Sequence, residues 1–446
     1  MSPLSPLHWR RRSARAALWL ATAVLLGAGC AVDRGVRSAV GVVAEGHGAL
    51  RAGCARVSIT PREPILLGGF GLLRESLGAH DPLYARALAL ECGGARVVLV
   101  ACDLIGLHHS TVCAVRERLR DVVSPGAVLV CATHTHSGPD TLGLWGLPPL
   151  ISGVDDAYLE ELIQGIALAA RRALAALEPA QLRWGCAQAP AVGISYNRRD
   201  PDTVDRTVTA LALERLDGSS LATLVHYACH PEALGSANRW VSADFAGPLC
   251  AEVEAQRPGV ALFVNGALGA MVTTAESEHS FAEAARIGEA IARLADQALV
   301  ERPAIREATL LCARAELEVP VDNWRYTLAD WGGVFPDRDF HGGRTQSELW
   351  GLRLGPWVLL SVPGEASPQL GFELEARAPS QPFTLAGLGN DELGYLLHED
   401  QWEDSRYRYE RTVSPGLPAA ALVREAGAAI LERLDDPSLA PSSPGE

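Results

Sequence analysis

The sequence predicts a mixed α/β fold, in which a mixed sheet is flanked by helices in a single large domain. From Arg56 onward, apolar runs rich in valine, leucine and alanine alternate with stretches of helical period. Hydrophobic residues make up 48% of the chain and charged residues 21%, so there is enough apolar surface to build a large core. No change in composition marks an internal boundary, which favours one domain over several.

Each expected strand is a short apolar run bounded by glycine, proline or charged residues. These runs lie at residues 96–101, 127–133, 207–214, 221–227, 261–265, 309–319, 357–362 and 383–388. The expected helices carry apolar residues at helical spacing and lie at residues 110–123, 156–177, 245–256, 280–300, 368–377 and 419–434. We also expect a hairpin across Asp217-Gly218, and Pro415 and Pro418 introduce the last helix.

We place this domain at residues 53–435, and we expect the two ends of the chain to lie outside it. Residues 1–30 resemble a signal peptide, because Arg10 to Arg15 are cationic and Ala16 to Leu26 form an apolar run too short to span a bilayer. The run ends at Cys30, as in a bacterial lipoprotein signal. We therefore expect export, either as a periplasmic or outer-membrane lipoprotein tethered through a lipidated Cys30 or as a secreted protein. Residues 31–52 are expected to form a tether and residues 436–446 a disordered tail.

Composition also excludes several functions. The net charge of -14 opposes binding to nucleic acid. All 39 basic residues are arginine, which rules out Schiff-base enzymes, Ser-Lys dyads and a P-loop lysine. No C-x-x-C pair occurs, which argues against zinc held by cysteines, and Cys102 and Cys131 lie in apolar runs typical of buried thiols. After the signal, no later segment is apolar for long enough to cross a membrane.

The strongest local signal is AVLVCATHTHSGPD at residues 127–140, where a buried strand runs into His134 and His136. Residues two apart on an extended strand face the same side, so both imidazoles can point into one cleft. That arrangement is typical of a metal site, although two polar residues at a strand end have the same pattern.

Two further segments carry polar residues after apolar runs. In LVHYACHPEALG, His226 lies inside the run and is expected to be a core histidine, whereas His230 precedes a proline where regular structure must change. In WVLLSVPGEASP, Glu365 follows a Pro-Gly turn. It could be a metal ligand or a solvated carboxylate at the start of a helix.

Taken together, these segments resemble the neutral/alkaline non-lysosomal ceramidase family. The shared motifs occur in the family's order: RVSITP at 56–61, THTHSGP at 133–139, ACHP at 228–231, PGE at 363–365, GND-x-x-GY at 389–395 and Tyr409-Glu410. The resemblance covers the family's catalytic domain and implies a zinc-dependent hydrolase of N-acyl amide bonds that uses metal-activated water. Its substrate would be a small-molecule or lipid amide.

The resemblance also implies the roles of individual residues. A Zn²⁺ ion would be held by His134, His230, Glu365 and Tyr395, around an open position of the kind found in hydrolytic sites. His136 would act as general acid or base, and Arg198 and Tyr409 would stabilise the oxyanion. Tyr407 competes with Tyr409 for the last role, because the spacing from Tyr395 is two residues longer than the family leads us to expect.

One segment departs from the family pattern. Where ceramidases carry a Gly-Asp-x-Ser-Pro-like segment, this chain has Gly266 to Thr273, GALGAMVT, without the acid or the serine. Thr273 has no evident base beside it in the sequence, so a serine-like nucleophile is unsupported. Two alternatives stay open: a zinc esterase, lactonase or peptidase on the same scaffold, and a surface-tethered binding protein with a degenerate site.

Overall fold

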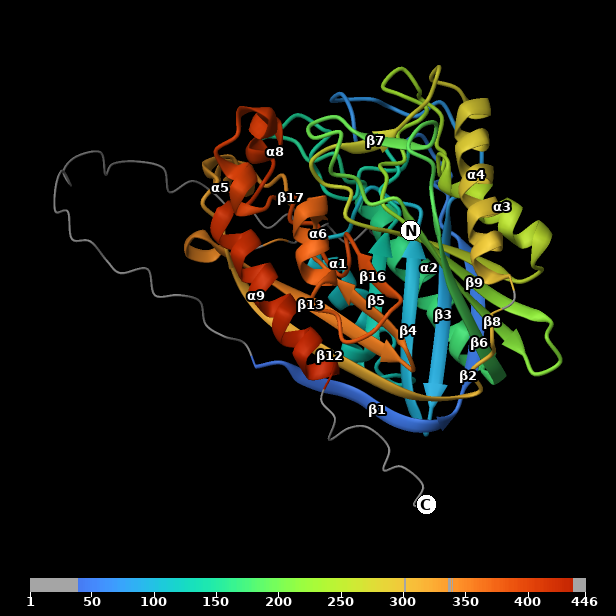
Figure 1. Cartoon of the computed structure of the whole chain (residues 1–446). Coiled ribbons are helices and arrows are strands. Elements are labelled where there is room, and N and C mark those ends of the chain that lie inside the picture. The colour runs from blue at the N-terminus through green and yellow to red at the C-terminus, as the bar shows by residue number, and fades with distance from the viewer. Residues whose placement is uncertain (1–38, 301, 336–337, 339, 436–446) are drawn as a thin grey trace, which may run out of the picture. The chain divides into compact units, whose positions relative to one another are not determined.

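The computed structural model describes residues 39–435, except 301, 336, 337 and 339. The predicted signal segment, its Cys30 and the 436–446 tail lie outside the described residues. Two large sheets and two short ones organise the fold (Figure 1). The helices are α1 (His109–Glu117), α2 (Asp156–Ala175), α3 (Ala246–Gln256), α4 (Phe281–Leu299), α5 (Trp324–Trp331), α6 (Pro368–Glu375), α7 (Glu399–Trp402), α8 (Arg408–Thr412) and α9 (Leu417–Leu434).

The larger sheet has eight strands in the order β10-β9-β8-β6-β2-β3-β4-β5. They are β2 (Arg51–Ser58), β3 (Tyr84–Cys92), β4 (Ala95–Cys102), β5 (Val128–Ala132), β6 (Glu178–Gln188), β8 (Thr207–Arg215), β9 (Ser220–Tyr227) and β10 (Val260–Asn265). The pairs β4–β5 and β9–β10 are parallel and the other pairs are antiparallel. The sheet is strongly curled: β10, at one edge, contacts β3, β4 and β5, which lie at or near the opposite edge.

The second sheet has five strands in the order β1-β12-β13-β14-β16. They are β1 (Gly41–Ala49), β12 (Glu307–Pro320), β13 (Arg344–Leu354), β14 (Trp357–Ser361) and β16 (Phe383–Ala386). Two short sheets pair β7 (Ser195–Asn197) with β11 (Val272–Thr274), and β15 (Glu365–Ala366) with β17 (Tyr395–Leu396).

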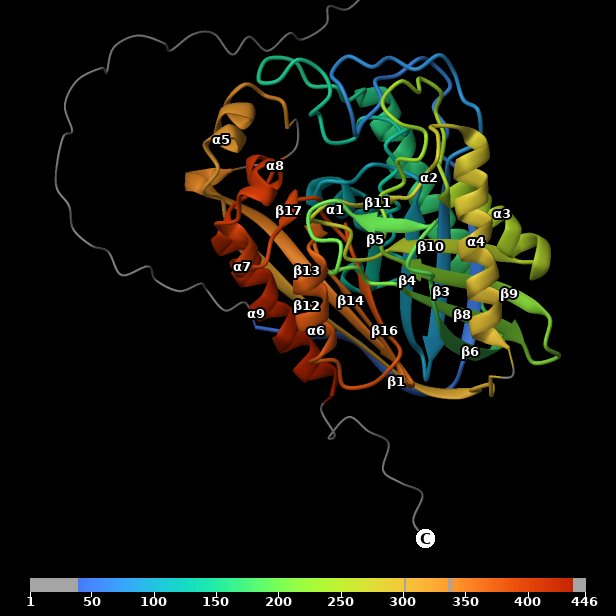
Figure 2. The ribbon, with the colours of Figure 1, turned by 45° about the horizontal axis from the view of Figure 1, so that its top comes forward.

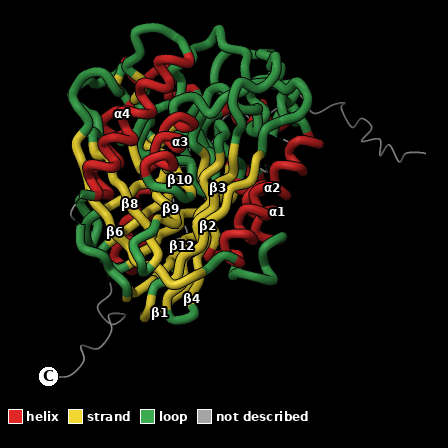
Figure 3. The backbone as a smooth tube through the Cα atoms, turned by 90° about the vertical axis from the view of Figure 1, so that its right-hand side faces the viewer, coloured by secondary structure: helices red, strands yellow, loops and turns green. Residues whose placement is uncertain are grey.

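The core follows from the two-residue period of the strands. In β12, Leu310 and Cys312 pack toward the eight-stranded sheet, whereas Leu311 and Ala313 pack toward α6 and α9. Strands β8 to β10 alternate in the same way between the sheet interface and the helices α3 and α4, while α2 packs on β2 to β4. The two sheets therefore pack against each other between helices, and Figure 3 shows strands inside and helices outside.

The predicted mixed α/β fold in a single large domain is confirmed, and each expected strand and helix corresponds to an element of the structure. The structure adds strands that the sequence did not reveal. Residues 41–52, expected to belong to a tether, form β1 and begin β2, so this part of the prediction is wrong. β1 is an edge strand, and its three glycines and exposed residues remove the alternation of apolar and polar residues that would reveal it. β3, β6 and β13 were missed because alanine, glycine, proline or charge interrupts their apolar runs.

The loops that follow the strand ends gather at one end of the molecule (Figure 2). Strands β5, β9 and β14 lead into the segments that contain His134, His230 and Glu365. None of the described helices is long and apolar enough to span a membrane. The nine described cysteines are all free thiols, and Cys102 and Cys131 are buried as expected.

Candidate metal centre

His134 lies just after β5, where the backbone leaves the strand. Its φ of 70° is in the left-handed region, which non-glycine residues rarely adopt and which often marks functional sites. The turn is fixed because His134 N donates to Leu104 O at 2.8 Å. Our expectation that His134 and His136 share one side of an extended strand is therefore wrong in its geometry: β5 ends at Ala132, and a turn brings the two imidazoles together.

The two histidines predicted as ligands are oriented in the same way. His134 Nδ1 lies 2.6 Å from Ile105 O, and His230 Nδ1 lies 2.7 Å from Val272 O. A carbonyl accepts only, so each Nδ1 carries the proton and each Nε2 is left as the atom that can bind a metal. His134 Nε2 is buried without any hydrogen-bond partner. This orphaned atom fits a site for a cation.

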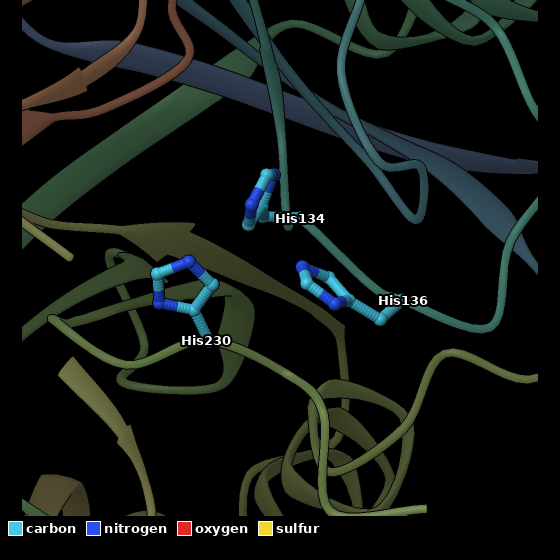
Figure 4. Close-up of side chains that lie close together, drawn as sticks. All are labelled: His134, His136 and His230. Carbon is cyan, nitrogen blue, oxygen red and sulfur yellow. The ribbon is translucent and has the colours of Figure 1, made fainter. Parts of the chain in front are cut away.

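His136 completes a buried group of three histidines with His134 and His230. One nitrogen from each ring lies within 4.8 Å of the others, and Figure 4 shows the rings turned toward a common space. Neither ring nitrogen of His136 has a hydrogen-bond partner. The ring packs on Gly69, where a Cβ would come within 2.4 Å of His136 Cγ, so this contact requires glycine.

Glu365 and Tyr395 enter the same space from the second sheet region, on the paired strands β15 and β17. Glu365 Oε2 lies 3.0 Å from His230 Nε2 and 3.7 Å from His134 Nε2. Tyr395 is the partner of Glu365 in the β15–β17 pair, and its side chain lowers the pKa of that carboxyl. The structure thus brings together all four residues predicted as zinc ligands, and places His136 beside them.

Burial acts on every member of this group, but in His230 the contacts with Glu365 outweigh it and raise the pKa. Burial lowers the pKa of His134 to about 4 and the pKa of His136 well below its ordinary value, so both rings are neutral near pH 7. Burial also raises the pKa of Tyr395 well above its usual value, and the neighbouring Glu365 raises it further. Burial acts on the pKa of Glu365 in the same direction, but His134 and His230 outweigh it and lower that pKa. Neutral imidazoles and an ionised carboxylate are the forms that ligate metals.

A cavity opens from the surface to these residues, with about 610 Å³ of empty space when the open solvent at its mouth is included. His134, His136, Glu365 and Tyr395 all line it. The other lining side chains include a large apolar set: Ile105, Leu142, Leu144, Trp145, Phe335 and Val413.

The structure separates the two candidate tyrosines. Tyr409 lines the cavity, is 50% exposed, and its ring centroid lies 6.0 Å from that of Tyr395. Tyr407 is 1% exposed and packs in a small core with Ala270 and Leu397. Arg198 is exposed, its guanidinium lies 6.0 Å from the ring centroid of Tyr196, and it is not among the residues that line the cavity.

Sequence reasoning missed a second set of polar residues around the cavity. His108, Arg338 and Glu392 all line it, and Arg338 contacts His108 Nδ1 at 3.0 Å. Burial, and then the neighbouring Glu365, raise the pKa of Glu392 well above its usual value. The only sequence signal for Glu392 was its place inside GND-x-x-GY; Arg338 and His108 belong to no motif.

Glu232 is the other residue that was missed. Its Oε1 accepts a hydrogen bond from the hydroxyl of Thr273, and its Oε2 lies 3.6 Å from His136 Nδ1. The expectation that Thr273 has no base beside it is therefore wrong. The acid comes from a segment 41 residues earlier in the chain, which spacing along the sequence could not reveal.

These features define a mixed α/β protein with a buried three-histidine group that can hold a metal ion, at the base of a largely apolar cavity. The chain belongs to the neutral/alkaline non-lysosomal ceramidase family: residues 51–280 match the N-terminal region of that family. The resemblance inferred from its motifs is thereby confirmed.

Individual relatives agree with this assignment. The chain is 24% identical over 216 residues to a neutral ceramidase of Pseudomonas aeruginosa and 25% identical over 215 residues to neutral ceramidase B of Dictyostelium discoideum. Each match covers 44% of this chain, but only 32% and 30% of the respective relative, so the chain aligns with about a third of their length.

Solved structures share the fold. The crystal structure of neutral ceramidase from Pseudomonas aeruginosa superposes with a TM-score of 0.72 at 20% identity, covering 86% of this chain and 75% of that one. A ceramidase complexed with a ligand named C2 also gives a TM-score of 0.72, at 18% identity, and covers 86% and 76%.

Proposed function

We propose that this protein is a zinc-dependent hydrolase of N-acyl amide bonds, ceramidase-like and acting on linear amides. The observation that carries the proposal is the convergence of His134 Nε2 and His230 Nε2 on Oε2 of Glu365, at the base of a cavity. Membership of the ceramidase family supports an amide as the bond that is cleaved.

Zinc is the metal that this donor set suits best. Two imidazole nitrogens, a carboxylate and the phenol of Tyr395 are borderline to hard donors, and no cysteine lines the cavity. When bound, a zinc ion would act as a Lewis acid and lower the pKa of a coordinated water. His134, His230, Glu365 and Tyr395 are the residues that we propose to hold it.

The residues of the chain itself would then supply positioning and proton transfer. His136 lines the cavity with a neutral imidazole whose nitrogens have no hydrogen-bond partner, which suits a general base toward the attacking water and an acid toward the leaving nitrogen. The hydroxyl of Tyr409 is a donor for the oxygen that gains charge. Arg198 would have to turn from Tyr196 to add a second donor.

The surroundings of the site favour a lipid amide over a polar one. The apolar cavity wall suits an acyl chain. Exposed large apolar side chains occur on three segments that also supply residues of the cavity lining: Leu72, Leu73, Leu147, Leu150, Ile151, Trp324, Leu328 and Trp331. These segments are linked to one another, since Leu73 N donates to Trp145 O and Pro149 O lies against Gly332. Apolar surface of this extent commonly marks a site of interaction.

A substrate panel tests the proposed function. The purified protein, loaded with zinc, is assayed on N-acyl sphingosines, N-acyl amino acids, simple esters and lactones. Turnover of an N-acyl amide with a long acyl chain is the expected result. Turnover of esters or lactones alone would replace the amidase proposal with an esterase or lactonase, and no turnover by the zinc-loaded protein would favour a binding protein.

The two tyrosines give a prediction that separates catalysis from stability. Tyr409→Phe should lower turnover by about 10- to 100-fold without changing stability, because it removes one donor from the cavity. Tyr407→Ala should lower the free energy of unfolding by about 3 kcal/mol, because it empties a buried core position. Steady-state kinetics and chemical denaturation of both variants are the measurements. Normal turnover of Tyr409→Phe, together with reduced turnover of a folded Tyr407→Phe, would reverse the assignment.

We also propose export with removal of about the first 29 residues, motivated by the cationic and apolar segments of the N-terminus. Mass spectrometry of the mature protein made in a bacterial host measures this. A chain that begins at diacylglyceryl-modified Cys30 supports a tethered lipoprotein, and cleavage elsewhere supports a secreted form. Retention of Met1 on the mature protein would contradict export.

A further inference from the structure

Glu232 is a buried carboxylate that lies beside the Nδ1 atom of His136. It is 8% exposed and follows His230-Pro231 in the chain. Its Oε2 lies 3.6 Å from His136 Nδ1. Within the described ranges, no arginine forms an ion pair with it, so His136 and Thr273 are the side chains that its two oxygens face.

Thr273 fixes the direction of this carboxylate. The threonine is fully buried on β11, and its hydroxyl donates to Glu232 Oε1. Because a hydroxyl has one proton to donate, this bond assigns Oε1 to Thr273 and leaves Oε2 facing His136 Nδ1 at 3.6 Å. Backbone pairing of Thr273 with His230 holds the two segments in register.

An acceptor beside Nδ1 has a consequence for the imidazole. A neutral histidine carries its proton on one nitrogen only, and the group that faces the ring decides which one. The carboxylate oxygen lies 3.6 Å from Nδ1, longer than a hydrogen bond, but its negative charge favours a proton on Nδ1 and leaves the lone pair on Nε2. The segment 266–273 contains no acid and no serine, and Thr273 carries its one side-chain hydroxyl, so the carboxylate beside this threonine comes from a different segment.

We infer that Glu232, held by Thr273, is a positioning residue that sets the Nδ1–H tautomer of His136 and directs its Nε2 lone pair into the cavity. The tautomer follows from this geometry alone, whereas its effect on turnover rests on the proposed function. Glu232 acts through His136 and does not itself contact the reacting atoms.

The tautomer can be measured without any substrate. Two-bond ¹H–¹⁵N correlation spectra of the purified, ¹⁵N-histidine-labelled chain distinguish the two neutral tautomers, and His136→Phe identifies the signals of His136. We expect the Nδ1–H form in the wild type and in Thr273→Ser. Glu232→Gln and Thr273→Val should shift the population toward the other tautomer. Thr274→Val is the matched control, because the hydroxyl of Thr274 is equally buried but has no hydrogen-bond partner.

Kinetics on the amide identified by the panel give the second readout. Glu232→Gln should lower kcat by about 10-fold or more with KM within about 2-fold, as expected when a general base is misdirected. Thr273→Val should lower kcat less, Thr273→Ser should restore it, and Thr274→Val should leave it unchanged.

The two readouts separate this inference from the proposed function. An Nε2–H tautomer of His136 in the wild type, or a tautomer that does not respond to Glu232→Gln, would overturn the inference. So would an equal loss of kcat in Thr273→Val and Thr274→Val. A tautomer that shifts as expected in a protein that turns over no member of the panel supports the role of Glu232 and rejects the proposed function.

Discussion

Replacement of His134 by alanine is expected to lower the zinc content from about one ion per chain to below about 0.1. Nε2 of His134 is buried and has no hydrogen-bond partner, and Nδ1 of the same ring faces the Ile105 carbonyl. The lone pair on Nε2 is therefore free to bind a metal. Turnover should fall by about 1000-fold or more, because the metal supplies the Lewis acid. Elemental analysis of the purified protein and steady-state kinetics are the measurements.

His226→Gln is the matched control for this prediction. His226 is equally buried and lies on β9, four residues before His230, but its Nε2 faces the carbonyl of Leu385 and it is outside the three-histidine group. It should keep its zinc. Because a bound metal stabilises the folded state, a chelator should lower the melting temperature of the wild type and not that of His134→Ala. Full zinc in a folded His134→Ala would disprove the ligand assignment.

The sequence predicted most of the site because its residues follow apolar runs. His134, His230 and Glu365 each come shortly after a buried strand, and the ends of such strands are where polar side chains converge in α/β folds. The same reasoning set His226 apart from His230. Its position inside an apolar run indicated a core residue, and the structure buries it against Leu385.

Contacts between distant segments could not be predicted from one sequence. Glu232 is a single acid two residues after His230, and nothing in the sequence indicates that Thr273 and His136 will face it. Arg338 reaches His108 across 230 residues of sequence for the same reason. Edge strand β1 was missed because its glycines and exposed residues remove the alternation that reveals a strand, although it pairs along its length with β12.

His136→Ala is expected to retain about one zinc ion per chain while lowering turnover by roughly 100-fold or more. This prediction decides between two readings of the same geometry. The nitrogens of His134, His136 and His230 lie within 4.8 Å of one another, which is the arrangement of a three-histidine metal site. Glu365, however, contacts both His134 and His230, pairs with Tyr395 between β15 and β17, and completes a ligand set without His136.

The backbone around His136 is held by contacts that do not involve a metal, so loss of zinc in a variant can be attributed to the missing imidazole. Arg74 donates to the carbonyl of His136, and the ring packs edge-on against Phe70 at a centroid distance of 4.9 Å. Loss of the imidazole should therefore leave the surrounding structure in place, and His136→Phe provides a variant that refills the volume. Zinc content by elemental analysis and kcat on the amide are measured for both. If both variants fold but lose zinc together with activity, His136 is a ligand, and the general base must be sought among the remaining side chains that line the cavity, with Glu392 the first to test.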